Sequence, residues 1–232
     1  MKANLVYIEG FDKSEAQMKK AKRSLEKFNL EYDLVPGVTP DTLAKYLKLY
    51  PLEPIVNSRA WNYQTENQPM LETKQSCFIN HLIFWEKVVE LNTPMMFLEH
   101  DALMVRKWTH PHWDEVLILN MDAAIKHNHN LNKKYAGTYQ YTNQQYCSRP
   151  LDYGLKYWKE NKFKGGSCAP GTAAYAVTPK GAKRLLQSYK ISGWDQSDFF
   201  INTKNVNIEY SDPQFFEFTG VNIKSSKGFS YV

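Results

Sequence analysis

The most informative stretch of the chain is an apolar run that ends in two closely spaced acids, Pro94-Met95-Met96-Phe97-Leu98-Glu99-His100-Asp101-Ala102-Leu103. Continuous apolar residues at this length are typical of a strand that is covered on both faces. Ligands of open α/β sheets bind beyond the carboxyl ends of the strands. Side chains two residues apart on an extended chain point to one face, so Glu99 and Asp101 can share a ligand there.

Two carboxylates on one face predict a site for Mg²⁺ or Mn²⁺, because hard cations prefer oxygen ligands and are commonly shared with substrate phosphates. The alternative is a strand end followed by a polar loop, where Glu99 and Asp101 only meet water. This stretch alone leaves the two interpretations open, and the flanking sequence has to separate them.

The flanking sequence alternates between predicted strands and helices. We expect strands at residues 4–9, 32–35, 95–98, 116–119, 173–177 and 206–210, and helices at 14–29, 39–50, 73–91 and 178–189. Ser14 and Gln17 form a capping-box pattern at the start of the first helix, and Thr178 with Pro179 starts the last one. Strand, helix and strand at this spacing make a βαβ unit. The pattern therefore predicts an α/β fold with a mostly parallel, Rossmann-like central sheet flanked by helices.

The composition is that of one folded domain spanning residues 1–232, with 43% hydrophobic and 23% charged residues. The net charge of +5 and the pI of about 8.9 favour anionic partners such as nucleotide phosphates, nucleic acid or an anionic membrane surface. A solvated basic surface explains the same charge. The oligomeric state is left open.

The cysteines and the hydropathy indicate a cytoplasmic protein. Cys77, Cys147 and Cys168 lack the spacing of a zinc site or a disulfide framework, which favours a reducing compartment. No apolar run reaches the ~20 residues of a transmembrane helix. Peripheral association with the inner membrane stays open, and a viral protein would act in the host cytoplasm.

Two segments depart from the alternating pattern. Residues 127–166 are rich in Asn, Tyr, Lys and Gln and form a divergent insert, and residues 217–232 are expected to be a tail. Basic residues in and near the insert interleave with aromatics, as in segments that follow a phosphate backbone and stack on bases. A solvated lysine-rich loop is the alternative. The candidate acceptor-binding residues are Lys133, Lys134, Arg149, Lys156 and Lys162.

The chain has neither Gly-x-Gly-x-x-Gly nor a Walker-type Gly-Lys-Ser/Thr, which argues against Rossmann dehydrogenases and P-loop kinases. Three blocks instead resemble glycosyltransferase family 25, which includes lipopolysaccharide-biosynthesis and procollagen galactosyltransferase-like enzymes. The first block pairs a Ser76-Cys77-Phe78-Ile79-Asn80-His81-Leu82 helix with Leu98-Glu99-His100-Asp101. The others are Gly171-Thr172-Ala173-Ala174-Tyr175-Ala176-Val177-Thr178-Pro179-Lys180-Gly181-Ala182 and Gln196-Ser197-Asp198-Phe199-Phe200.

The resemblance implies a GT-A-like fold and a metal-dependent, inverting transfer from a UDP-type sugar donor. It implies Asp101 and Glu99 as ligands of Mn²⁺ or Mg²⁺, and His100 departs from the family at the middle acid of its Glu-Asp-Asp. Asp198 is the first candidate for the base that deprotonates the acceptor, and Asp195 the second. A helix-capping role is the alternative for both acids.

Four further residues are candidates for binding the donor together with Glu99. Tyr7 and Glu9 end the first strand, where bases dock in such folds, although Tyr7 is equally a candidate core residue. Gly171 and Thr172 can bring backbone N–H groups near the sugar or phosphate, and Gly171 can also simply make a turn. His81 falls among the apolar positions of its helix, which favours a core histidine.

The functional hypotheses differ chiefly in the molecule that accepts the sugar. The resemblance implies a lipopolysaccharide or another surface glycan. A viral (phage) member that glycosylates hydroxymethylated pyrimidines in DNA is the main alternative, since the basic charge and the insert suit phosphates. A nucleotide-sugar or nucleic-acid binding module without catalytic activity is a third hypothesis, and His100 is the residue that favours it.

Overall fold

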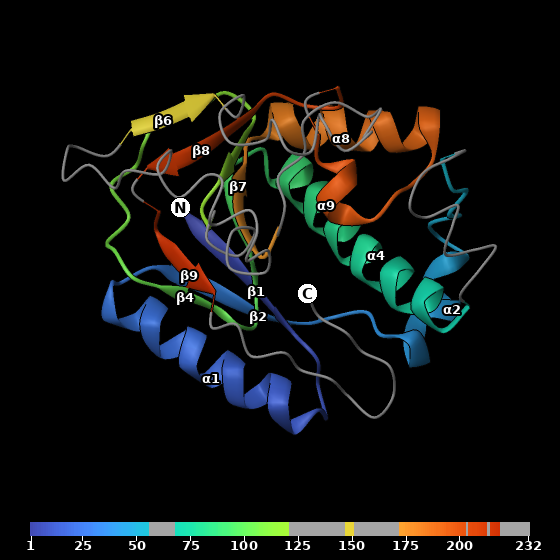
Figure 1. Ribbon diagram of the computed structural model, residues 1–232, viewed down its shortest axis with the longest axis horizontal. Coiled ribbons are helices and arrows are strands. Elements are labelled where there is room, and N and C mark those ends of the chain that lie inside the picture. The colour runs from blue at the N-terminus through green and yellow to red at the C-terminus, as the bar shows by residue number, and fades with distance from the viewer. Residues whose placement is uncertain (56–67, 121–146, 151–171, 203, 213, 219–232) are drawn as a thin grey trace, which may run out of the picture.

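The computed structural model describes residues 1–55, 68–120, 147–150, 172–202, 204–212 and 214–218 (Figure 1). The helices described are α1 (Asp12–Lys27), α2 (Pro40–Leu47), α4 (Gln68–Leu91), α8 (Pro179–Ser192) and α9 (Ser197–Phe200). The strands are β1 (Lys2–Tyr7), β2 (Glu31–Pro36), β3 (Met95–Glu99), β4 (Ala102–Met104), β5 (Val116–Ile118), β6 (Cys147–Pro150), β7 (Ala174–Val177), β8 (Ile208–Asp212) and β9 (Phe216–Phe218).

The central sheet has the strand order β2-β1-β3-β7-β5-β8-β6 among the described residues. β2, β1 and β3 pair in parallel, and so do β5 and β8. β7 is antiparallel to both β3 and β5, and β6 is antiparallel to β8. Five of the seven strands therefore run in one direction, which confirms the mostly parallel α/β sheet flanked by helices. β4 and β9 form a separate two-stranded sheet.

Helices cover both faces of the sheet because the strands alternate their side chains between two apolar cores. Met96 and Leu98 of β3 face the core that α1 closes, while Met95 and Phe97 face the core under α4, α8 and α9. Figure 1 shows α1 on one side of the sheet and the other three helices together on the opposite side. The continuous apolar run of the sequence is thus explained by a strand buried on both faces.

The first helix begins earlier than the predicted capping box. α1 starts at Asp12, so Ser14 lies inside its first turn and is fully buried. The Ser14 hydroxyl accepts a hydrogen bond from the Ile8 N–H at 2.8 Å, and Glu15 accepts one from the Gly10 N–H at 2.9 Å. Both side chains therefore fasten the loop that leaves β1 rather than the helix end, and the capping-box prediction was wrong.

Four other elements differ from the sequence expectation, and one of them is β4, which follows the turn at Asp101 and was not predicted. α4 begins at Gln68 rather than Thr73, so it adds a turn before the predicted start. β6 falls inside the insert, and β9 falls where a tail was expected; β9 pairs with β4. Neither β6 nor β9 has the continuous apolar run by which the equally short β5 and β7 were predicted. Most of the insert and residues 219–232 lie outside the described residues.

The antiparallel strand β7 determines what lies at the carboxyl edge of the sheet. Because β7 opposes its neighbours, its amino end lies beside the carboxyl end of β3. The Glu99 N–H donates to the Ala173 carbonyl oxygen at 2.8 Å, and Leu98 pairs with Ala174. The residue before Ala173 is Thr172, so the second sequence block starts at the edge where the first one ends.

The start of α8 follows the prediction from Thr178 and Pro179. The Thr178 hydroxyl accepts from the Gly181 N–H at 3.1 Å and donates to the Asp114 carbonyl oxygen at 2.9 Å. Gly181 packs so tightly against the chain before β5 that an added Cβ would lie 2.6 Å from the Glu115 carbonyl oxygen. This contact fixes the helix against the sheet.

We therefore expect Gly181→Ala to destabilise the protein. Replacing a helical glycine by alanine ordinarily stabilises by about 0.5–1 kcal/mol. Here the Cβ meets backbone that cannot move aside, so the free energy of unfolding should fall by about 1–3 kcal/mol. Urea denaturation measures it, with Lys183→Ala on the exposed side of the same helix as control. An increase in stability for Gly181→Ala would contradict the packing described.

Candidate functional site

The two predicted metal-binding acids lie at the carboxyl edge, on either side of a turn. β3 ends at Glu99, and His100 and Asp101 form the turn that leads into β4. The extended chain thus stops one residue earlier than the shared-face argument requires. Asp101 nevertheless remains close enough to Glu99 for its charge to raise the pKa of that carboxyl. Asp101 is only 1% exposed, and its Oδ1 atom is buried without a hydrogen-bond partner among the described residues.

Burial and like charge together disfavour ionisation at this edge. Burial, together with the neighbouring Asp101 and Asp198 carboxylates, raises the pKa of Glu99 to about 8, while the Lys74 ammonium acts in the opposite sense. Burial also raises the pKa of Asp101 to about 7. A carboxyl with a raised pKa prefers its neutral form until a positive charge compensates it. A cation bound at this edge would therefore stabilise the ionised carboxylates and the folded protein.

Asp198 reaches the same edge through Thr172. The Thr172 N–H and hydroxyl both donate to Asp198 Oδ1, at 3.1 and 2.7 Å. No described residue donates a hydrogen bond to the other carboxylate oxygen, Oδ2. These bonds join the second and third sequence blocks, and the effect of Asp198 on the pKa of Glu99 places all three blocks at one site.

The remaining predicted residues are placed differently. The Asp195 side chain accepts from the Gln196 N–H at 2.8 Å, a local contact like the capping alternative. Glu9 is exposed in the turn after β1 and does not line the cleft at this edge. Arg149 belongs to β6 at the far margin of the sheet, and its side chain lies outside the description. The others outside the described residues are Gly171, Lys133, Lys134, Lys156 and Lys162.

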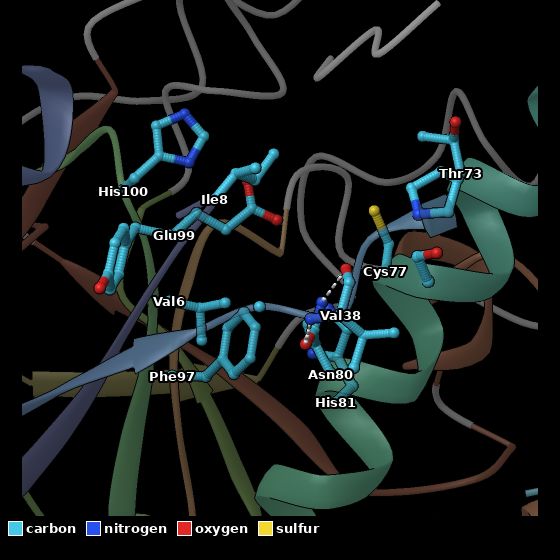
Figure 2. Close-up of a pocket in the computed structure, with 14 residues that line it drawn as sticks. Val6, Ile8, Val38, Thr73, Cys77, Asn80, His81, Phe97, Glu99 and His100 are labelled. Carbon is cyan, nitrogen blue, oxygen red and sulfur yellow. Dashed lines mark hydrogen bonds between the residues drawn. The ribbon is translucent and has the colours of Figure 1, made fainter. Parts of the chain in front are cut away.

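A cleft opens beside Glu99, between the ends of β1 and β3, the loop after β2 and helix α4 (Figure 2). Figure 2 shows Glu99 on the strand side of this cleft and Thr73 and Cys77 on the α4 side. Tyr7, predicted to bind the donor, lines the cleft and is half-buried. Val6 pairs with Glu99 across β1 and β3, so the cleft continues directly from the acidic edge.

Asn80 secures the wall of the cleft that β2 supplies. Its Oδ1 accepts from the Val38 N–H at 2.7 Å, and its Nδ2 donates to the Val38 carbonyl oxygen at 3.3 Å. The neighbouring Gly37 N–H donates to the Tyr7 carbonyl oxygen at 2.7 Å. The Asn80 amide thus offers a separate acceptor and donor to the two backbone groups of Val38.

Lys74 is a site residue that the sequence reasoning missed. It is 8% exposed, and its positive charge lowers the pKa of both Glu99 and Cys77. The signal was present, because Lys74 lies four residues before Phe78 and seven before His81. It therefore shares the buried face of α4, where a charged residue needs a partner or a function.

His81 is confirmed as a histidine buried in the core, with a hydrogen-bond partner at Nδ1. It stacks on Phe97 at 4.1 Å between ring centroids, and its Nδ1 lies 2.8 Å from the Tyr175 hydroxyl. The same hydroxyl accepts from the Trp85 indole N–H at 3.0 Å. Burial lowers the pKa of His81 to about 3 and that of His100 to about 4, so both rings are neutral at physiological pH.

The acidic edge does not form a metal site made of protein ligands alone. In the part of the chain that the structure describes, no three His, Cys, Asp or Glu side chains come together as metal ligands. Glu99 and Asp101 form a pair, which leaves most ligand positions of a bound cation to water or substrate. Among the described helices, none combines the length and the apolar character needed to cross a membrane.

A mostly parallel sheet with acids and a cleft at its carboxyl edge is the arrangement of nucleotide-binding α/β enzymes. The sequence profile of glycosyltransferase family 25 (LPS biosynthesis protein) matches residues 4–201, so the chain belongs to this family and is a glycosyltransferase. The match covers all three blocks that the sequence analysis identified.

Two further comparisons concern curated proteins and solved structures. A search of curated proteins finds no significant match. Among solved structures, the chain is similar to the crystal structure of mouse xyloside xylosyltransferase 1 in its apo form, at 9% sequence identity and a TM-score of 0.33. The alignment covers 87% of this chain and 81% of that chain.

The raised pKa values predict that the cation-free protein loses stability as the pH rises. The unfolded chain releases these protons near pH 4, whereas the folded chain keeps them until about pH 7 for Asp101 and about pH 8 for Glu99. Between these limits the folded state binds more protons, so the free energy of unfolding falls with pH.

Thermal unfolding in EDTA between pH 5 and 8 tests this prediction. Asp101→Asn should flatten the decline and shift Tm at pH 8 upward relative to wild type, at roughly 2–4 °C per kcal/mol for a chain of this size. Asp114→Asn is the control, because burial does not dominate that carboxyl and Lys180 lowers its pKa. A wild-type Tm that rises steadily from pH 5 to 8 would contradict the assignment.

Proposed function

We propose that the chain is a metal-dependent, inverting glycosyltransferase that moves a sugar from a UDP-type donor to an acceptor hydroxyl. The observation that carries the proposal is the meeting of Glu99, Asp101 and Asp198 at one edge, next to a cleft. A family 25 enzyme needs a place for the donor, a place for its diphosphate and a base for the acceptor. In this proposal the cleft binds the donor, the pair of Glu99 and Asp101 binds its diphosphate through a cation, and Asp198 is the base.

The acid pair suits Mn²⁺ or Mg²⁺ bound together with a diphosphate. Asp101 Oδ1 is buried and lacks a hydrogen-bond partner among the described residues, and both acids have a raised pKa that a cation would relieve. Asp101 and Glu99 would hold the ion, which supplies charge neutralisation for the leaving diphosphate. The substrate phosphates and water would complete the coordination, as is usual for Mg²⁺ sites.

Asp198 is the proposed base. The acceptor hydroxyl gives its proton to the carboxylate while its oxygen attacks the anomeric carbon and the bond to the diphosphate breaks on the opposite side. Thr172 holds Oδ1 through two hydrogen bonds, which orients the carboxylate and leaves Oδ2 for the acceptor. Thr172 is thus a positioning residue for this base.

A surface glycan such as lipopolysaccharide is the proposed acceptor class. DNA with hydroxymethylated pyrimidines is the second candidate, and one structural observation favours it. Helix α1 exposes a row of basic side chains, none of which forms an ion pair with a described residue: Lys13, Lys19, Lys20, Arg23 and Lys27. Such a row can follow phosphates. The proposal that the 127–166 insert contacts the acceptor stays a prediction.

Two measurements separate these candidates. Mass spectrometry of glycan and DNA acceptors after incubation with Mn²⁺ and a panel of nucleotide sugars identifies the product. Binding to duplex DNA at increasing salt then tests the second candidate, because each phosphate contact contributes about −0.9 to the slope of log K against log salt. Absence of DNA binding at physiological salt would remove it.

Asp101→Asn is expected to abolish Mn²⁺-dependent turnover while the fold remains intact, because the amide cannot supply the charge that holds the ion. Steady-state donor turnover and circular dichroism measure the two effects. Asp114→Asn, at the opposite end of the sheet, should retain activity. Wild-type turnover in excess EDTA equal to that with Mn²⁺ would defeat the metal assignment.

Asp198→Asn is expected to lower kcat by ~10²–10⁴ with little change in donor KM. The amide oxygen still accepts both hydrogen bonds from Thr172, so the variant removes basicity and keeps the local structure. Asp195→Asn is the matched control and should keep kcat near the wild-type value. A normal kcat for Asp198→Asn combined with a large loss for Asp195→Asn would transfer the role to Asp195.

A further inference from the structure

The buried network around Tyr175 fixes the position of one proton. The Trp85 indole nitrogen can only donate, so the Tyr175 oxygen accepts from it at 3.0 Å. The Tyr175 hydroxyl proton then has one described acceptor, His81 Nδ1, at 2.8 Å. The opposite direction, from His81 to Tyr175, would leave the hydroxyl proton without an acceptor in a fully buried place, which is costly.

It follows that Nδ1 of His81 carries no proton. The ring is neutral because burial lowers its pKa far below physiological pH. The remaining ring proton must therefore lie on Nε2, and this tautomer is set by Tyr175 rather than by a ligand. Nε2 has no hydrogen-bond partner in the described part of the chain, and His81 lines the cleft (Figure 2).

The surroundings of His81 suit a flat, neutral group. Phe97 stacks on the ring at 4.1 Å, and Val6, Ile8 and Val38 add apolar surface to the same cleft. None of the described residues that line the cleft is a lysine or an arginine, which favours a neutral group over a phosphate beside His81. A nucleobase offers both an apolar face and hydrogen-bond acceptors on its edge.

We propose that His81 is a specificity-determining residue whose fixed Nε2–H donates a hydrogen bond to a carbonyl oxygen of the uracil base of the donor. This inference rests on the proposed UDP-type donor. Because Nε2 can only donate, a base with an amino group in that position would be rejected. Tyr175 is a positioning residue that acts through His81, whereas Trp85 only donates to the Tyr175 oxygen.

Calorimetric titration with UDP, 2-thio-UDP and 4-thio-UDP in the presence of Mn²⁺ tests the proposal. Sulfur accepts hydrogen bonds poorly, so one of the two thio-substitutions should weaken binding to the wild type by about 3- to 10-fold. The same substitution should have no effect on His81→Phe, which keeps the stacking on Phe97 but cannot donate.

Two core variants separate the tautomer from simple packing. Tyr175→Phe removes the hydroxyl that fixes the ring and should lose most of the thio effect. Trp85→Phe also perturbs the core, yet leaves the hydrogen bond that the Tyr175 hydroxyl donates to His81 Nδ1, so it should keep the effect. Long-range proton–nitrogen NMR of isotope-labelled histidine should show the proton of His81 on Nε2 in the wild type and in Trp85→Phe.

The outcomes distinguish this inference from the proposed function. A wild type that binds UDP with equal affinity to both thio analogues, or an NMR spectrum with the proton on Nδ1, overturns the role of His81 and leaves the glycosyltransferase proposal standing. A wild type that binds no UDP with Mn²⁺ overturns the UDP-type donor and the inference together.

Discussion

The hydrogen bond from the Glu99 N–H to the Ala173 carbonyl oxygen, 2.8 Å long, is the contact on which the site depends. It sets β7 antiparallel to β3, so the amino end of β7 lies at the carboxyl edge of the parallel strands. A parallel β7 would instead bring Val177 to this edge and leave Thr172 at the opposite end of the sheet. Asp198 attaches to Thr172 through two hydrogen bonds, so it reaches the edge only because Thr172 is there. One strand direction therefore unites three segments that are far apart in the sequence.

Helix α4 combines a structural and a functional role along a single face. Phe78 and Trp85 pack in the core beneath the sheet, while Lys74 and His81 occupy neighbouring positions on the same face. A polar group in such a place is tolerated only when it is hydrogen-bonded or compensated by charge. His81 meets this condition through Tyr175, and Lys74 through its proximity to Glu99. Because these contacts hold the side chains before any ligand binds, one wall of the cleft is already formed.

The sequence was sufficient for the features that depend on local pattern. The apolar run before Glu99, the start of α8 at Thr178 and the core position of His81 were all predicted from spacing and capping rules. The capping role of Ser14 was wrong because a serine near a helix start can bond to the preceding loop as readily as to the helix. The direction of β7 and the contact between Thr172 and Asp198 could not be predicted, because both depend on pairings between distant segments. Lys74 was recognisable only as a charged residue on an apolar face.

The balance of charge at the edge explains why His100 is compatible with the site. The charges of Asp101 and Asp198 both raise the pKa of Glu99, and among the described residues Lys74 alone lowers it. Burial keeps His100 neutral, so it adds no charge to this group. An acid in place of His100 would add a fourth carboxyl and raise the cost of ionising Glu99 and Asp101 further, since like charges in a poorly solvated place disfavour one another. The buried carboxyls at this edge therefore destabilise the folded protein, and a bound positive charge would remove this destabilisation. Local destabilisation of this kind is expected where a protein binds its substrate.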